Sequence, residues 1–382
     1  MMKTLISTLI ALVILSGCSE KGGKSVETEL AGIMENHKAV GLAVAAVKDG
    51  KIVYSKTLGY KDWENKTPMA EDDVLRIASI SKTFVATAIL QLVEQGKLSL
   101  DADVSDLMGF KVRNPHFPDE KITIRMLLSH TSSMSDSNGY FTLDNLNPAT
   151  SSTWEKAWNS YKPGSGYQYC NLGYNTLGAI IEIASGERFD VYIKNHILNP
   201  LGVYASYNVM DLDPSKFIKI YKYQASSDAY VCSTTAYDSP EEKLGSYIMG
   251  YSTPCFSPTG GMKISAKDLA KVMMMHMNNG ELDGVKILQK ETSEMMQSEI
   301  TPTNYPGESY GMAMISSNDL ITGHRVTGHD GIALGAYTIM YWDKAEKFGV
   351  VAMTNGCDGK FSGTFADILC ETADCLYNHF GK

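Results

Sequence analysis

The chain has 382 residues, of which 44% are hydrophobic and 20% charged, a composition typical of a globular protein with a sizeable core. This length allows two or three ordinary domains or one large composite domain. The formal net charge of −9 argues against nucleic acids and anionic membrane surfaces as partners.

The first residues have the pattern of an export signal. Lys3 precedes an apolar run, residues 5–15, that is too short to span a membrane, so residues 1–17 are predicted to be a secretory signal. The ending Leu-Ser-Gly-Cys resembles a bacterial lipobox, which implies cleavage before Cys18 and a lipid on its sulfur. A plain signal peptide with an incidental cysteine is the alternative. With residues 18–30 as a flexible tether, we expect a lipid-anchored protein of the cell envelope, periplasmic or at the cell surface.

The next segment combines a hairpin with an amphipathic helix. Residues 40–47 and 51–58 are predicted strands, joined by a tight turn at Asp49-Gly50. A helix then begins near Ser79. Its apolar stripe recurs at helical spacing and Gly96 ends it; the stripe is Ile80, Phe84, Ala88 and Leu92.

Ser79 and Lys82 lie three residues apart, on one face of this helix. A hydroxyl beside an amine is what a serine nucleophile with a lysine partner requires. The helix start also offers free N–H groups to a developing anion. A helix-capping serine with a solvent-facing lysine is the alternative.

The middle of the chain, residues 98–265, is predicted to be helices and loops without clear strands. Within it, Tyr169-Cys170-Asn171 is predicted to lie on a loop, with Tyr169 and Asn171 facing the same side. A tyrosine whose pKa is lowered by a nearby lysine can shuttle a proton, and an asparagine can hydrogen-bond both a lysine and a substrate amide. The alternative is a buried tyrosine beside a helix-capping asparagine.

The last third returns to strands and ends in a helix. Strands are predicted at residues 310–315, 321–327, 336–341 and 348–354, and a terminal helix at residues 361–380. Strands at both chain ends predict an α/β (α+β) fold. In it, residues 31–97 and 266–382 form an antiparallel sheet with flanking helices, and residues 98–265 form an inserted helical domain. Ligands would bind in the cleft between them.

A third polar motif, Gly328-His329-Asp330-Gly331, follows the strand at residues 321–327. Its glycines allow a ligand to approach the backbone closely. By itself, a lone histidine here would be a structural residue.

The order of the three motifs is more specific than any one of them. Ser-x-x-Lys at a helix start, Tyr-x-Asn in the helical middle and His-x-Gly on a late strand together resemble the class C branch of the serine β-lactamase and penicillin-binding protein family. The resemblance covers residues 40–380. Supporting stretches are Leu127–Ser132, Pro163-Gly164, Asn199–Gly202, Gly260-Gly261 with Ser265, and Thr354-Asn355.

The resemblance implies an acyl-enzyme mechanism without a metal or cofactor. Ser79 would be acylated, and Lys82 and Tyr169 would move the proton from Ser79 to the leaving group. Asn171 would orient Lys82 and the substrate, together with His329, Asp330 and Gly331. The backbone N–H groups of Ser79 and Ile332 would form the oxyanion hole.

Two departures bear on the substrate. The late-strand motif is usually Lys-Thr-Gly in the β-lactamases proper. Histidine at that place is common among relatives that act as D,D-peptidases, D-aminopeptidases or esterases. Asp330 would repel a substrate carboxylate unless it points away. Cys170 stands where a serine or alanine is usual, which exposes the site to oxidation.

The function expected is therefore that of an exported serine hydrolase acting on a β-lactam, a D-Ala-D-Ala or other D-peptide. The alternatives are an esterase for small acyl groups with the same residues, and a sensor that stays acylated. We expect a monomer whose partners are its small-molecule or peptide substrate and, through the lipid, the membrane.

Two other motifs are interpreted as incidental. Gly307–Gly311 matches the G-x-S-x-G elbow but is followed by a predicted strand instead of a helix, so Ser309 is expected to be structural. Ser135-Asp136-Ser137 resembles an S-D-N motif, but its third residue lacks the amide. Among the cysteines, Cys232 and Cys255 are the best candidate pair, and Cys357 could reach Cys370 or Cys375.

Overall fold

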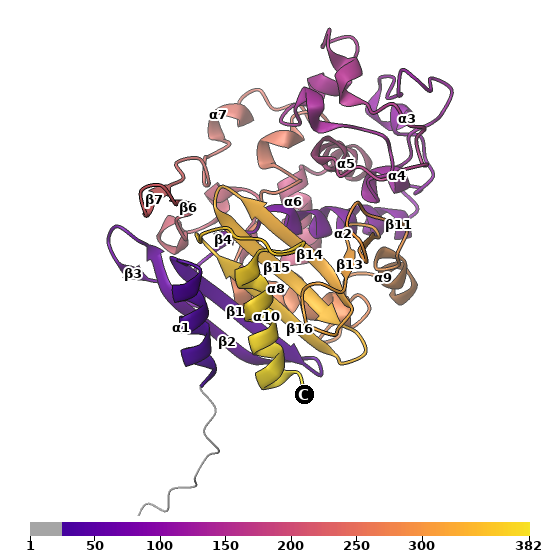
Figure 1. Cartoon of the computed structure of the whole chain (residues 1–382). Coiled ribbons are helices and arrows are strands. Elements are labelled where there is room, and N and C mark those ends of the chain that lie inside the picture. The colour runs from indigo at the N-terminus through magenta and orange to yellow at the C-terminus, as the bar shows by residue number, and fades with distance from the viewer. Residues whose placement is uncertain (1–24) are drawn as a thin grey trace, which may run out of the picture.

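The structure, a computed structural model, describes residues 25–382 and joins both ends of the chain in one antiparallel sheet of nine strands (Figure 1). In spatial order the strands are β11 (Thr301–Pro302), β12 (Ser309–Tyr310), β13 (Ile315–Ser317), β14 (Val326–Ala333), β15 (Ala336–Asp343), β16 (Phe348–Thr354), β1 (Gly41–Lys48), β2 (Lys51–Asp62) and β3 (Thr67–Pro68). The pairing of β16 with β1 confirms the predicted sheet built from both chain ends.

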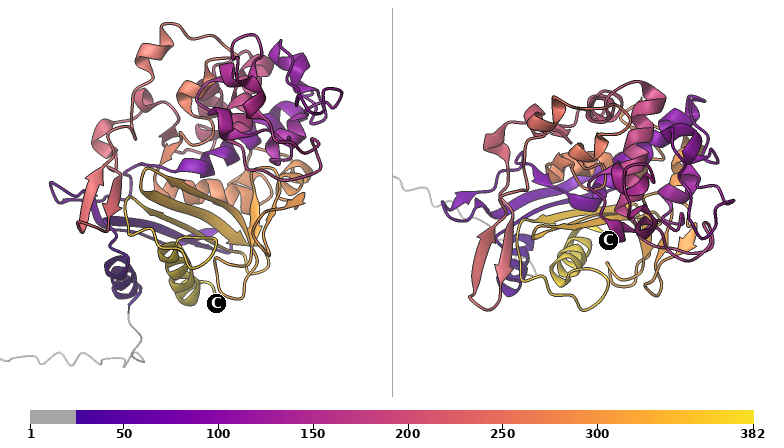
Figure 2. Two further views of the ribbon diagram at one scale, coloured as in Figure 1. Left: turned by 45° about the horizontal axis from the view of Figure 1, so that its top comes forward. Right: turned by 90° about the horizontal axis from the view of Figure 1, so that it is seen from above.

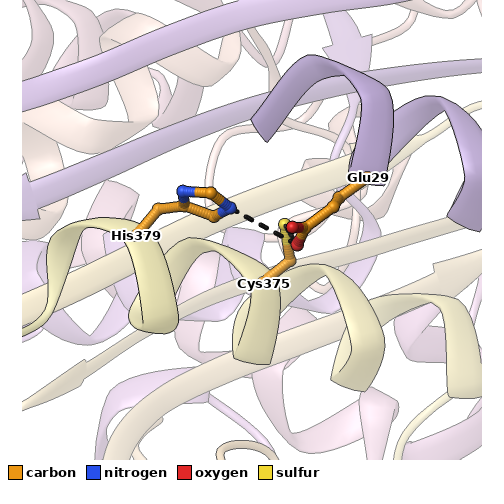
Figure 3. Close-up of side chains that lie close together, drawn as sticks. All are labelled: Glu29, Cys375 and His379. Atoms are coloured by element: carbon orange, nitrogen blue, oxygen red, sulfur yellow. Dashed lines mark hydrogen bonds and ion pairs between the residues drawn. The ribbon is translucent and has the colours of Figure 1, made fainter. Parts of the chain in front are cut away.

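The central strands are buried on both faces, which explains their continuous apolar sequences. Helices α1 (Val26–Asn36) and α10 (Asp367–Phe380) cover one face, and α8 (Ala266–Met277) covers the other (Figures 1 and 2). Where α1 meets α10, Glu29 pairs with His379 at 3.3 Å and lies beside the Cys375 thiol (Figure 3).

The segment at residues 98–265 lies beyond the α8 face of the sheet and is mainly helical (Figure 2). The helices on this side are α2 (Ser81–Glu94), α3 (Val104–Met108), α4 (Ile124–Leu128), α5 (Asn171–Ser185), α6 (Phe189–Ile193), α7 (Glu241–Leu244) and α9 (Lys290–Met296).

The expectation of no clear strands in this segment was wrong, because short strands join it to the rest of the molecule. The strand β8 (Lys263–Ile264) pairs with β4 (Leu75–Arg76) and with β5 (Ala205–Ser206). Within the segment, β6 (Tyr221–Gln224) and β7 (Ala229–Cys232) form a hairpin. A second short hairpin, β9 (Glu281–Leu282) with β10 (Val285–Lys286), follows after the segment. Strands of two to four residues leave no periodicity for a sequence to reveal.

Three boundaries in the last third also differ from the prediction. The predicted strand at 310–315 is split between β12 and β13, and the terminal helix begins at Asp367, not residue 361. The predicted strand at 321–327 is instead β14, Val326–Ala333, so the Gly-His-Asp-Gly motif lies inside the strand and not after it. Glycines normally weaken a strand, but here they allow close packing.

The six cysteines of the described residues, Cys170 to Cys375, are all free thiols, so the suggested pairing of Cys232 with Cys255 is not formed. Cys18 and the predicted signal and tether up to residue 24 lie outside the described residues. The prediction of a flexible tether up to residue 30 was wrong, because residues 26–30 belong to α1, where Leu30 is buried. Within residues 25–382, no helix is long and apolar enough to cross a membrane.

Candidate active site

Ser79 lies in a 3-10 turn, η1 (Ala78–Ile80), that leads directly into α2. Lys82 occupies the first turn of α2, and its Nζ donates to the Ser79 Oγ at 3.1 Å. Ser79 is half-buried, whereas Lys82 is completely buried. The predicted pair therefore faces inward, which contradicts the reading of a solvent-facing lysine.

The ammonium of Lys82 has three acceptors and no carboxylate partner within the part of the chain that the structure describes. Besides Ser79, it donates to the Asn171 Oδ1 at 2.9 Å and to the Thr259 carbonyl at 2.8 Å. Burial lowers the pKa of Lys82 to about 7, against the attraction of Asp136 and Asp330. A lysine with this pKa can accept a proton near neutral pH.

Tyr169 lies against Lys82, with the Lys82 Nζ 4.7 Å from the centre of its ring. Its hydroxyl is buried and has no hydrogen-bond partner among residues 25–382. Burial raises the pKa of Tyr169 well above its ordinary value, and the nearby Ser79 hydroxyl only partly offsets this. The expectation that a nearby lysine lowers this pKa is not met, because burial is the largest influence and raises it. The phenol stays neutral and can serve as a proton donor.

Asp136 holds Asn171 in place, a role that the sequence reading missed when it set aside the Ser-Asp-Ser motif. Its carboxylate accepts from the Asn171 N–H (2.9 Å), the Asn171 Nδ2 (2.8 Å) and the Leu172 N–H (2.9 Å) at the start of α5. Because Nδ2 is bound to Asp136, the amide oxygen must face Lys82, where the Thr259 hydroxyl also donates to it. The position of Asp136, two residues before Asn138-Gly139, gave no sign of this contact.

His130 packs against Tyr169 and accepts a hydrogen bond from the next residue. The Cys170 N–H donates to His130 Nδ1 at 3.1 Å, and the imidazole packs against the Tyr169 ring with centroids 4.2 Å apart. Burial lowers the pKa of His130 well below its ordinary value, so the ring is neutral with its proton on Nε2. This histidine belongs to the Leu127–Ser132 stretch, but the sequence assigned it no role.

The backbone of β14 approaches η1 as closely as a glycine permits. A Cβ on Gly331 would lie 2.3 Å from the Ile77 carbonyl oxygen and 3.0 Å from the Ser79 nitrogen. The Thr338 hydroxyl on β15 lies 3.0 Å from the Ile77 carbonyl and 3.2 Å from that of Gly331, and it ties the two segments together. The predicted oxyanion donors, Ser79 and Ile332, thus come from backbone segments in direct contact.

His329 and Asp330 point to opposite faces of β14, as consecutive residues of a strand do. His329 is buried and lies 3.2 Å from the Tyr310 hydroxyl, and burial with the Lys82 charge lowers its pKa to about 3. Asp330 accepts from the Tyr341 hydroxyl at 3.3 Å, on the α10 side. Histidine is therefore neutral here, and the Asp330 carboxylate points away from Lys82.

Two further groups belong to the scaffold. Ser309, in the G-x-S-x-G match, lies on β12 and accepts from Arg325 at 3.1 Å, which agrees with a structural role. The only set of potential metal ligands among residues 25–382 is Glu29, Cys375 and His379, on the far side of the sheet (Figure 3). Burial and Glu29 raise the pKa of Cys375 to about 12, so its thiol is a poor ligand, and Glu29 is already paired with His379.

Two cavities meet at Ser79. One, of about 580 Å³, is lined by Asn171, Thr259 and the residues before η1. The other, of about 740 Å³, is lined by Tyr169 and His329. Ser79 and Ile332 line both, so a carbonyl held between them would send one half of a substrate into each cavity.

Comparison with known proteins identifies a matching family and several relatives. The profile of the Beta-lactamase family matches residues 26–369. The chain is 25% identical over 337 residues to protein flp of Staphylococcus aureus (strain MRSA252), which covers 87% of this chain but only 62% of that protein. It is 26% identical over 354 residues to penicillin-binding protein 4 of Amycolatopsis lactamdurans, with 88% of this chain and 87% of the relative covered.

A solved structure of similar fold is the octameric penicillin-binding protein homologue from Pyrococcus abyssi. The two are 27% identical, with a TM-score of 0.74, and 94% of this chain and 77% of the other are covered. The expectation of a monomer stays a prediction. Because the family profile matches most of the chain and the solved homologue has the same fold, the chain belongs to the Beta-lactamase family of serine β-lactamases and penicillin-binding proteins.

Proposed function

We propose that the protein hydrolyses amide or ester bonds through an acyl-enzyme on Ser79. One observation supports this above all: the buried Lys82 Nζ, with a pKa of about 7, lies 3.1 Å from the Ser79 Oγ. Burying a lysine lowers the stability of the fold, but a lysine with a pKa near 7 can act as a general base, so such groups are typical of active sites.

The contacts suggest an order of proton transfers. Neutral Lys82 takes the proton of Ser79 as its Oγ bonds to the substrate carbonyl carbon, and the N–H groups of Ser79 and Ile332 stabilise the oxyanion. The neutral Tyr169 phenol donates its proton to the leaving group as that bond breaks, and Lys82 returns a proton to Tyr169. Water then attacks the acyl group, with the same groups acting in reverse.

The leaving group enters the cavity of about 740 Å³, because Tyr169 lines that cavity. Glu308 lines it, as does Asp330, whose carboxylate faces the Tyr341 hydroxyl and not Lys82, and no lysine or arginine of residues 25–382 lines it. Burial and Asp330 raise the pKa of Glu308 to about 7. A leaving group that carries a carboxylate, such as a terminal D-alanine or the acid half of a β-lactam, would be disfavoured here. This favours esters and amides with a neutral leaving group, the esterase candidate, over potent β-lactam hydrolysis.

A kinetic panel would test both statements. Penicillin, a cephalosporin, a D-Ala-D-Ala peptide and a 4-nitrophenyl ester would be compared with wild-type protein and Ser79→Ala. We expect Ser79-dependent turnover that is fastest with the ester. No turnover of any substrate by pure protein would refute the proposal, and an acyl-enzyme that persists for hours would point instead to a sensor.

We also propose export and lipid anchoring through Cys18, supported by the signal pattern at residues 1–17. Metabolic labelling with a fatty acid should mark the wild-type protein and should be lost in Cys18→Ala. Labelling that persists in this variant would contradict the anchor.

A further inference from the structure

The cavity of about 580 Å³ contains two neighbouring cations that the mechanism does not use. Arg76 on β4 and Lys263 on β8 both line it, together with Ser79. They pair directly across this short antiparallel ladder, so their side chains leave the same face. Like charges in directly opposite positions are destabilising.

Neither cation is balanced by a carboxylate. Lys263 is only 6% exposed, and its Nζ donates to the Tyr207 carbonyl at 2.7 Å. The Arg76 Nε donates to the Gly260 carbonyl at 2.8 Å, and its Nη2 lies 3.4 Å from the Ser257 Oγ. Across residues 25–382, neither Arg76 nor Lys263 forms an ion pair.

The remaining charged residues of this cavity do not supply the balance. Asp238 and Lys243 also line it, but both are exposed and their charges are opposite. Burial and the Arg76 charge together lower the pKa of Lys263 to about 7, as expected for a cation held near another without an anion. Asp238 attracts the Arg76 charge from its exposed position but forms no ion pair with it, so within residues 25–382 the buried cations of this cavity have no paired counter-ion.

The geometry of the site indicates that the acyl half of the substrate enters this cavity. Ser79 and Ile332 line both cavities, which places the reacting carbonyl at their junction. Tyr169 lines the other cavity, which receives the leaving group. The acyl half must then extend past Asn171 toward Arg76 and Lys263.

We propose that Arg76 and Lys263 form a carboxylate subsite, so that the preferred substrates carry an anionic acyl group. This inference rests on the proposed function and specifies its substrate class. Arg76 can present its remaining N–H groups in a planar fork, and Lys263 adds a point charge beside it. Acyl groups derived from dicarboxylic acids fit the 580 Å³ cavity and leave a neutral alcohol or amine on the other side.

The test uses two chromogenic esters that differ only in charge: mono-4-nitrophenyl adipate and its methyl ester. The matching glutarate and pimelate pairs vary the reach of the carboxylate. The measured quantity is the ratio of kcat/KM for the acid to that for its methyl ester. For at least one chain length, we expect kcat/KM for the acid to be about tenfold or more above that for the methyl ester. One charge-assisted hydrogen bond is enough to give a difference of this size.

Variants then locate the subsite. Lys263→Met should reduce the ratio at least about fivefold, whereas Lys263→Arg should retain most of it. Lys267→Met removes an equal charge at an exposed ion pair with Glu71, outside the cavity, and should leave the ratio unchanged. Arg76→Lys serves as the second variant if Lys263→Met does not fold.

The outcomes separate the two proposals. If wild-type protein releases 4-nitrophenol from both esters in a Ser79-dependent way, but kcat/KM for the acid does not exceed that for its methyl ester, the carboxylate subsite alone is overturned. A ratio that Lys263→Met leaves unchanged overturns the assignment to this cavity. No Ser79-dependent release from any ester overturns the ester-hydrolase proposal and this inference together.

Discussion

Lys82 is the residue whose protonation governs the proposed chemistry. It must be neutral to accept the Ser79 proton, and burial lowers its pKa to about 7. We therefore expect kcat/KM for a neutral ester to rise with pH through about 7 and then to level off. A stopped-flow profile between pH 5 and 9 would check this, and a flat profile would contradict the role of Lys82 as base.

The burial of Lys82 also lowers the free energy of unfolding of the protein. Its pKa is lower in the folded than in the unfolded chain, so unfolding takes up protons between about pH 7 and the ordinary pKa of lysine, and stability rises with pH in that range. Lys82→Met removes the penalty. We expect activity to be lost while the unfolding temperature rises by several degrees, more at pH 6 than at pH 9. Lower stability of this variant at pH 6 would contradict the argument.

Asp136 acts through Asn171. In Asp136→Asn the new amide can donate where the carboxylate accepted, which frees Asn171 to turn its amide nitrogen toward Lys82. We expect kcat to fall about 10–100-fold. Because the Asp136 charge raises the pKa of Lys82, the acidic limb of the pH profile should also move to lower pH. Ser137→Ala, at an exposed neighbour, is the control, and an unshifted acidic limb would argue for a purely structural role.

At the scale of single residues, the sequence identifies reactive side chains that occur in motifs of a characteristic order. Ser79, Lys82, Tyr169 and Asn171 were found in this way, and the structure brings them together. The supporting contacts were not predictable. Thr259 contributes only a carbonyl to Lys82, which any residue could supply, and nothing in the sequence pairs His130 with Cys170.

At the scale of the elements, the close contact between β14 and η1 positions the two proposed oxyanion donors. The methyl group of Gly331→Ala would meet the Ile77 carbonyl at 2.3 Å and push β14 away from Ser79. We expect activity to fall at least about 100-fold as the oxyanion donors separate. Gly32→Ala in α1, where nothing lies within 4 Å of the new methyl group, should retain activity. Full activity of Gly331→Ala, with an unchanged fold by circular dichroism, would contradict the contact.

This contact also explains why the sequence misplaced β14. The motif with Gly328 and Gly331 was placed after a strand at residues 321–327, with its glycines expected to admit a ligand. In the folded protein a Cβ at Gly328 would lie 2.0 Å from the Met340 carbonyl, so the glycines allow neighbouring backbones to approach. Such tertiary requirements override local propensity, whereas β1 and α2 were predicted well because their apolar patterns are long.

Across residues 25–382, stability derives from the apolar core and not from disulfide bonds. The six cysteines of residues 25–382 are free. We expect the unfolding temperature to be the same with and without reductant. Alkylation of the denatured, unreduced protein should modify all six of these cysteines by mass spectrometry, and a protected pair would reveal a disulfide.

The pairing of β1 with β16 means that neither chain end completes the sheet alone. Leu42 lies opposite Thr354, and the Thr338 hydroxyl reaches the Ile77 carbonyl across 261 residues of sequence. The N-terminal hairpin therefore keeps an open edge until β16 pairs with it during folding. Ser79 lies early in the chain, but the second predicted oxyanion donor, Ile332, lies on β14. The proposed nucleophile therefore stays inactive until the last strands are in place, so catalytic activity would report a completed fold.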